Sequence, residues 1–199
     1  MSSSPLSSEG PLLSLEERAP LYAWLAPFFA QEIDAEVWAH LKTPSIATLF
    51  APFDDDLSSW TNQPFTETLN ETCAAEFARL FLLPGGVPPL ASVWIQGDRE
   101  KLGAELSAVV ARSCEVLSRT PQRGEAWGKL PLDHIGLIFD LASRAGVSTD
   151  PLDREVGAHL DEAMLGTSLA RFGAALEEKA ELPVYRALGR CVKELHARS

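Results

Sequence analysis

The fold of the chain is decided by residues 77–94, FARLFLLPGGVPPLASVW. Apolar side chains recur at helical spacing before and through the front half of this stretch: Leu69, Cys73, Phe77, Leu80 and Phe81. Pro84 cannot continue a helix, and the two glycines that follow it supply the backbone freedom of a C-cap or a tight turn. The stretch therefore predicts an amphipathic helix that ends just before Pro84.

The back half of the stretch contains two further prolines within residues 87–90, so the chain is expected to cross the surface in an extended conformation. It then brings Leu90, Val93 and Trp94 back toward the end of the helix. Loops normally run over wet surface, so large apolar side chains here are unusual. They predict either that the loop packs into the core or that it forms one wall of an apolar groove.

No segment of the chain shows the sustained alternation of a half-buried strand, which predicts an all-α fold. Residues 14–197 are expected to form one compact helical domain, preceded by a disordered Ser/Pro/Gly-rich tail over residues 1–13. Residues 118–130 are polar and include Pro121 and Gly124, which makes them the best candidate for a hinge between two packed halves. Such a hinge permits a domain-swapped dimer as well as a monomer.

Helix starts are predicted at side chains that can accept hydrogen bonds from free backbone amides: Ser14, Asp34, Asp98 and Asp150. Glu17 has the spacing to complete a capping box with Ser14. Pro20 and Pro27 predict that the first helix is kinked or segmented, and Gly166 with Thr167 predicts an interruption near the C-terminal end. The acidic run that begins at residues 54–56 is expected to be a solvated loop and not a cation site, because nothing spaced like a calcium loop follows it.

The formal net charge of −11 over 199 residues disfavours binding to phosphate backbones or anionic lipid surfaces. A cationic peptide partner is compatible with this charge, and so is an ordinary acidic cytosolic protein with no such partner. Cys73, Cys114 and Cys191 lie far apart among apolar neighbours, so we expect buried thiols and neither a disulfide framework nor a zinc site. With no signal-peptide pattern at the N-terminus and no run approaching the roughly 18 apolar residues of a membrane span, a cytoplasmic location is expected.

Asp133 and His134 form the pair that most suggests catalysis. Neighbouring residues on a helix point about 100° apart, so these two side chains would not face each other as a base and its orienting partner do. A structural role is favoured, in which Asp133 is the N-cap of a buried helix over residues 132–142 and His134 reaches another element. The Gly-rich phosphate loops, the zinc-protease pattern and the nucleophile-elbow pattern are absent.

Three blocks of sequence resemble the TorD/DmsD family of cytoplasmic chaperones for twin-arginine-exported molybdoenzymes. The first combines residues 79–81, RLF, and Pro84 with the PP and SVW groups that end at Trp94. The second is residues 131–136, PLDHIG, and the third is residues 183–189, PVYRALG, which is most similar to the DmsD-like branch. The blocks occur in the family's order, although the proline loop has fewer tryptophans than DmsD-like chaperones carry.

The resemblance implies a TorD-like all-helical fold and a binding protein with no catalytic residues, metal or cofactor. Its partners would be a twin-arginine signal peptide, the immature apoenzyme of a molybdopterin-dependent oxidoreductase, or both, during cofactor loading and proofreading before export. The positions that match the family's peptide-binding residues are Phe77, Leu80, Phe81, Pro89, Leu90, Trp94, Asp133 and His134. An apolar segment behind two arginines favours an apolar groove with carboxylates nearby, and Asp133 is a candidate arginine partner.

Two alternatives remain open at this stage. The chain could be a nucleotide-binding protein or an enzyme that uses Asp133 and His134 as acid–base groups. It could also be a purely structural helical subunit that binds no peptide. The identity of the client enzyme stays open.

Overall fold

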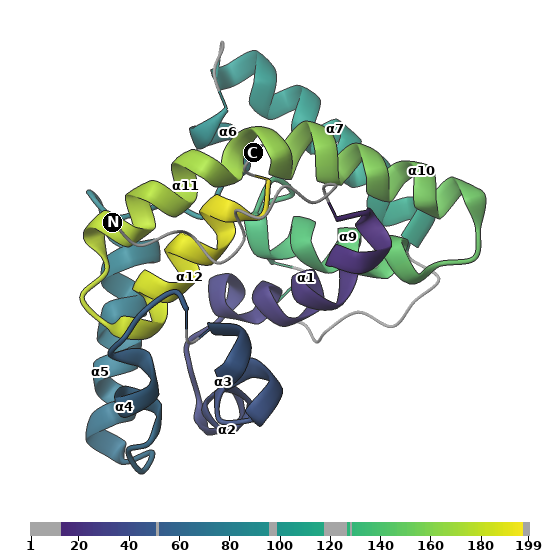
Figure 1. Cartoon of the computed structure of the whole chain (residues 1–199). Helices are drawn as coiled ribbons and strands as arrows, with labels where there is room; N and C mark the ends of the chain where they lie inside the picture. The colour runs from purple at the N-terminus through teal and green to yellow at the C-terminus, as the bar shows by residue number, and fades with distance from the viewer. Residues whose placement is uncertain (1–12, 51, 96–98, 118–126, 128, 197–199) are drawn as a thin grey trace. The chain divides into compact units, whose positions relative to one another are not determined.

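The chain divides into two units, each with its own core. The computed structural model describes residues 13–50, 52–95, 99–117, 127 and 129–196 (Figure 1). The predicted tail, the predicted cap at Asp98 and most of the predicted hinge lie outside those ranges. The first unit contains Gln31–Pro88 and Ala170–Ser199, and the second contains Leu12–Ala30 and Pro89–Leu169.

Both units are helical, and no strand is found in the part of the chain that the structure describes. The second unit contains α1 (Leu15–Ala30), α6 (Ala91–Trp94), α7 (Arg99–Leu117), α9 (Ile135–Val147), α10 (Pro151–His159) and the π-helical turn η2 (Leu160–Leu165). The first unit contains α2 (Ala35–Leu41), α3 (Pro44–Phe50), α4 (Leu57–Thr61), α5 (Glu67–Phe77), the π-helical turn η1 (Ala78–Leu82), most of α11 (Gly166–Lys179) and α12 (Pro183–Glu194). The predicted all-α class is confirmed.

Three of the predicted helix starts are confirmed by their capping bonds. The Ser14 amide donates to Glu17 Oε2 at 2.7 Å and the Glu17 amide donates back to Ser14 Oγ at 3.3 Å, which is a complete capping box. The side chain of Asp34 accepts from the amides at the start of α2, and that of Asp150 accepts from Leu152 at 2.9 Å. Local hydrogen bonding, which sequence spacing can report, therefore fixes where these helices begin.

The first helix is not segmented, and the predicted interruption at Gly166 does not occur. α1 is one continuous helix that includes Pro20 and Pro27. Gly166 keeps right-handed helical dihedrals (φ −57°, ψ −27°), and the Thr167 hydroxyl donates to the carbonyl of Ala163 at 2.7 Å. Thr167 therefore back-bonds within a continuing helix, and η2 joins α10 to α11 without an interruption.

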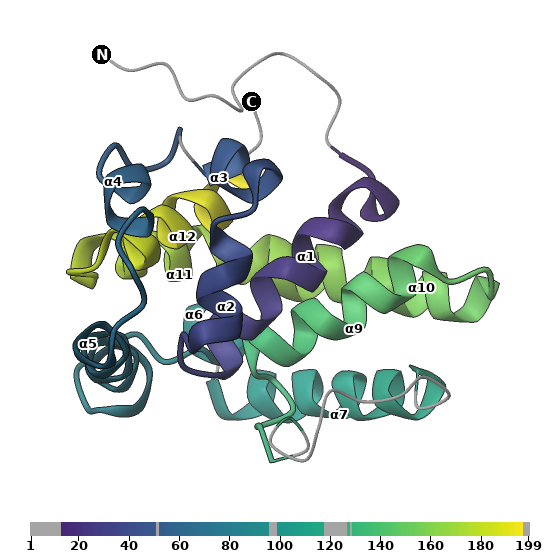
Figure 2. The ribbon, with the colours of Figure 1, turned by 90° about the horizontal axis from the view of Figure 1, so that it is seen from below.

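The core of the second unit is built on α1 and α9, which run side by side in both views (Figures 1 and 2). The rings of Tyr22 and Phe139 are 5.1 Å apart, and both side chains are fully buried. A Cβ added to Gly136 would lie 2.9 Å from the carbonyl oxygen of Ala26, so this close approach of two backbones requires glycine. α1 and α9 therefore pack directly against each other in the core of this unit.

In the first unit, the acidic run after Phe53 is partly buried, contrary to the expectation of a solvated loop. Asp54 is only 5% exposed and accepts a 2.9 Å bond from Arg186 Nε on α12. A buried carboxylate needs such a partner, and the arginine lies more than a hundred residues away in the sequence. The residues that follow form the short helix α4, whereas Asp55 and Asp56 are exposed as predicted.

The turn that ends the helical part of the opening stretch is formed as the sequence predicts. η1 ends at Leu82, Leu83 is extended (ψ 151°), and Gly85 has φ +83°. Side chains rarely adopt this left-handed conformation, so glycine is required at that position. Among the described residues, no helix has both the length and the apolar content that crossing a bilayer demands.

Candidate functional site: the motif junction and the groove between α7 and α10

The first two sequence blocks meet inside the second unit, at a contact that we call the motif junction (Pro89–Trp94 with Pro131–Ile135). The Ile135 amide donates to the carbonyl of Pro89 at 2.8 Å, and the Ala91 amide donates to the carbonyl of Asp133 at 2.9 Å. Leu90 and His134 form an isolated antiparallel bridge. The proline loop is therefore held along the start of α9 by backbone bonds, which explains why the two blocks occur together.

The carboxylate of Asp133 accepts a hydrogen bond within the motif junction and does not cap α9. Its Oδ2 accepts from Ser92 Oγ at 2.5 Å, and the residue is 8% exposed. The N-cap is His134, whose Nδ1 accepts from the Gly136 amide at 3.2 Å. The predicted capping role of Asp133 is therefore wrong by one residue, because the amide of Ile135 bonds to Pro89 across the junction.

Burial of the His134 ring keeps it neutral. Desolvation lowers its pKa from 6.5 to about 4, and the neighbouring Asp133 only partly opposes this. A neutral imidazole can offer Nδ1 as the acceptor that caps α9. Since Asp133 bonds to Ser92 while His134 bonds to Gly136, the two side chains do not form a catalytic base and its orienting partner.

The remaining predicted peptide-binding residues differ in exposure. Pro89 is buried, whereas Leu90 and Trp94 are half-buried and so retain accessible surface beside the junction. Phe77, Leu80 and Phe81 belong to the first unit and are at most 7% exposed. The predicted set is thus divided between the two units.

The aromatic residues of the first unit belong to a hydrophobic core. Phe81 packs edge-on against Phe77 at a centroid distance of 5.1 Å and against Tyr185 of α12 at 5.6 Å. These contacts bring the first block next to the third block, which contains Tyr185. Packing therefore accounts for the burial of Phe77 and Phe81, and their contact with a peptide stays a prediction.

A buried carboxylate joins Arg79 of the first block to the residues just before the third block. Glu76 is 4% exposed, accepts from Arg79 Nε at 2.7 Å and Nη2 at 2.9 Å, and also accepts from the Glu181 amide at 2.7 Å. This bidentate bond raises the pKa of Arg79. Arg79 additionally donates to the carbonyl of Lys179 at 2.7 Å. Arg79 is thus held in place by contacts within its own unit.

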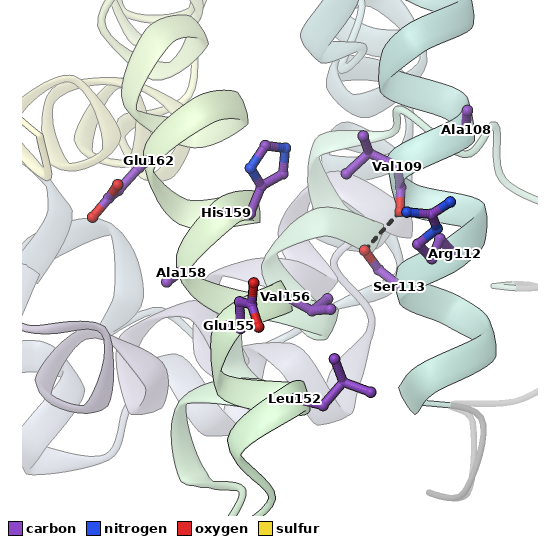
Figure 3. Close-up of a pocket in the computed structure, with 10 residues that line it drawn as sticks. All are labelled: Ala108, Val109, Arg112, Ser113, Leu152, Glu155, Val156, Ala158, His159 and Glu162. Carbon is purple, nitrogen blue, oxygen red and sulfur yellow. Dashed lines mark hydrogen bonds between the residues drawn. The ribbon is translucent and has the colours of Figure 1, made fainter.

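An open groove that the sequence pattern did not predict lies elsewhere in the second unit, between α7 and α10 (Figure 3). Its volume is about 710 Å³. Residues from α7, α10 and the start of η2 line what we call the α7–α10 groove: Ala108, Val109, Arg112, Ser113, Leu152, Glu155, Val156, Ala158, His159 and Glu162. The heptad spacing of Leu152, Val156 and His159 on one face of α10 was the signal available in the sequence.

Figure 3 shows Leu152, Val156 and His159 extending from α10 toward α7. Leu152 is 52% exposed, which is high for a large apolar side chain. On the α7 side, the Ser113 hydroxyl donates to the carbonyl of Val109 at 2.7 Å, so it is satisfied within its own helix. The groove therefore combines apolar side chains with charged ones, and the Ser113 hydroxyl is already paired.

The chain is similar to a known chaperone over about half its length. Over 109 residues it is 33% identical to the chaperone protein TorD of Aggregatibacter aphrophilus (strain NJ8700), a match that covers 49% of this chain and 50% of that protein. This similarity supports membership of the TorD/DmsD family. No protein-family model matches the chain. Assignment to the DmsD-like branch stays a prediction.

Proposed function

We propose that the protein is a cytoplasmic chaperone of the TorD/DmsD type. It binds the twin-arginine signal peptide, the immature apoenzyme of a molybdopterin-dependent oxidoreductase, or both. Its role is to assist cofactor loading and to proofread the enzyme before export. The observation that carries the proposal is the similarity to the TorD chaperone, and the distant relationship suggests a protein without catalytic activity of its own.

The surface chemistry of the second unit supports peptide binding. A signal peptide combines two arginines with an apolar run, so it needs apolar contact area and carboxylates. Leu90 and Trp94 are half-buried, and Ser92 between them in the sequence donates to the Asp133 carboxylate. We propose that Leu90 and Trp94 contact the peptide, while Pro89, His134 and the aromatic cluster of the first unit support the fold.

A direct binding measurement tests this function. The probe is a fluorescently labelled synthetic peptide with two consecutive arginines followed by an apolar run of about 12 residues, titrated with the full chain by fluorescence anisotropy. The matched control replaces both arginines with lysines, which keeps the charge but removes bidentate recognition of carboxylates. We expect the arginine peptide to bind saturably and more tightly than the lysine peptide. Absence of binding, or equal affinity for both peptides, would contradict twin-arginine recognition.

A further inference from the structure

A buried group of charged and polar side chains joins α1 to η2 within the second unit. Arg18 donates through Nη2 to Oδ2 of Asp161, and the hydroxyl of Tyr22 donates to Oδ1 of the same carboxylate. Arg18 is 7% exposed, Asp161 is 1% exposed and Tyr22 is fully buried. Burial and the nearby Asp161 raise the pKa of Tyr22 well above its ordinary value, so the phenol stays protonated and donates. We call Arg18, Tyr22 and Asp161 the buried triad.

Stability alone does not explain the buried triad. Burying an ion pair removes both groups from water, and apolar residues of similar volume often stabilise a core equally well. The Nε of Arg18 is also buried, and it has no hydrogen-bond partner in the part of the chain that the structure describes. The loss of water around Arg18 is therefore only partly offset, which indicates a role beyond packing α1 against η2.

Asp161 belongs to a helical turn that is wider than an α-helical one. The amide of Gly166 donates to the carbonyl of Asp161, which is five residues back and not four. Just after the turn, the buried Ser168 hydroxyl donates to the carbonyl of Met164 at 2.7 Å, so a side chain supports the altered hydrogen bonding. Such π-helical turns are rare and are frequently found at functional sites.

The wide turn allows Asp161 and Leu169 to face the core together. On an uninterrupted α-helix, two residues eight positions apart point about 80° apart, at roughly 100° per residue. One extra residue in the turn reduces this angle to about 20°. Asp161 is 1% exposed and Leu169 is fully buried. If the segment became a regular α-helix, one of the two would turn toward solvent, and water would solvate the carboxylate but not the leucine.

We propose that the buried triad is a conformational latch that holds η2 in its π-helical form. When the latch opens, Asp161 turns outward to solvent and residues 160–169 form a regular α-helix. A carboxylate suits such a latch, because it is stable in water once its partners release it, whereas an apolar side chain would oppose opening. The buried triad shares no residue with the positions proposed to contact a peptide, so the latch stands or falls independently of the proposed function.

Hydrogen exchange of single amides, followed by NMR on the full chain, tests the latch. Arg18→Met leaves Asp161 buried without its cation, so exchange in η2 should accelerate about tenfold more than exchange in α9. Arg154→Met is the matched control, because Arg154 also joins α10 to α1, through an exposed 3.3 Å ion pair with Glu16. It should change exchange in η2 and α9 by less than about twofold. Equal acceleration of η2 and α9 in Arg18→Met would show that the pair only adds to global stability, and would overturn the latch.

Two further variants keep the test decisive. Tyr22→Phe removes one donor and keeps the ion pair, so it should fold and accelerate exchange in η2 about threefold more than in α9. Arg18→Met/Asp161→Leu has no carboxylate to turn outward, so the difference between η2 and α9 should fall below about twofold. A double variant in which η2 still exchanges as fast as in Arg18→Met would contradict the role of Asp161.

Cα chemical shifts distinguish a latch from local unfolding. In Arg18→Met, residues 160–169 should keep helical shifts while their amides exchange faster, because the open form is still a helix. Random-coil shifts over these residues would mean that the turn unfolds, and the proposal would fail.

Discussion

The motif junction and the α7–α10 groove are both in the second unit, yet they have opposite chemistry. In the junction, backbone bonds join Pro89 to Ile135 and Ala91 to Asp133, and the Asp133 carboxylate already has a donor in Ser92. In the groove, Leu152 is half exposed and Glu155 faces solvent. The polar groups of the residues that form recognisable motifs therefore hydrogen-bond to one another. The residues that line the accessible groove belong to no recognisable motif.

A recognisable sequence motif can therefore mark residues that hold a surface in place as well as residues that contact a ligand. A buried, hydrogen-bonded side chain contributes chiefly to stability, because its polar groups and apolar area are already used. An exposed apolar side chain beside an unpaired carboxylate can still stabilise a complex, because a partner can bury the apolar area and pair with the charge. Substitutions can separate residues that stabilise the fold from residues that contact a ligand, and they follow from the largest expected effect to the smallest.

Phe81→Ala should have the largest effect, and on stability. Phe81 is 7% exposed and packs against Phe77 and Tyr185, so removing its ring should lower the free energy of unfolding by about 3–5 kcal/mol. Urea unfolding followed by circular dichroism measures this change. A loss below about 1 kcal/mol, combined with a large loss of peptide affinity, would instead make Phe81 a ligand contact.

Acid should destabilise the protein through His134. Its pKa is about 4 in the folded state and 6.5 in the reference state, so the unfolded chain binds more protons between these values. This contribution to stability is present above pH 6.5 and is lost as the pH falls toward 4, by about 3 kcal/mol in total.

His134→Asn is the control for the acid effect. Asparagine is among the best N-cap residues and does not titrate, so the variant should keep α9 capped while flattening the pH dependence between pH 6.5 and 4. Unfolding curves measured across this range give the comparison. A variant that loses as much stability as the wild type on acidification would show that another group is responsible.

Trp94→Ala tests whether the motif junction also contacts the ligand. Trp94 is half-buried, so its accessible face could serve as an aromatic anchor whose removal weakens peptide binding by about 2 kcal/mol. Anisotropy titrations at a temperature where the variant is folded measure the loss. If the affinity of the folded variant is unchanged, Trp94 belongs wholly to the structural part of the junction.

Ser92 and Asp133 should show the smallest effects, and a pair of substitutions separates their roles. Ser92→Ala removes the hydroxyl donor but leaves the carboxylate, and should cost about 1 kcal/mol of stability. Asp133→Asn keeps an oxygen that can accept from Ser92 but removes the charge. Weaker arginine-peptide binding in Asp133→Asn alone would place the Asp133 carboxylate against an arginine. Equal binding by both variants would confine Asp133 to the junction.

The sequence predicted what depends on local pattern. The capping bonds of Ser14 and Asp34 and the glycine turn at Gly85 follow from spacing and backbone preferences over a few residues. The helical continuation through Gly166 was missed because glycine permits a break without requiring one. In each of these cases the decisive interaction lies within one turn of the chain.

Long-range pairing accounts for most of what the sequence did not predict. Asp54 can be buried because Arg186 bonds to it. The N-cap of α9 is His134 and not Asp133 because the Ile135 amide bonds to the carbonyl of Pro89. Neither partner can be identified from spacing alone. The α7–α10 groove was missed for the same reason, because Val109 and Val156 each look like ordinary core positions until their helices are placed together.

Photo-crosslinking tests most directly whether the second unit binds a twin-arginine peptide beside the motif junction. The arginine peptide would carry a benzophenone side chain within its apolar run, and mass spectrometry would identify the residues it joins after irradiation. The account predicts crosslinks to residues 90–94, reduced by excess unlabelled arginine peptide and by Trp94→Ala. Crosslinks confined to the first unit, or unaffected by competition, would contradict it.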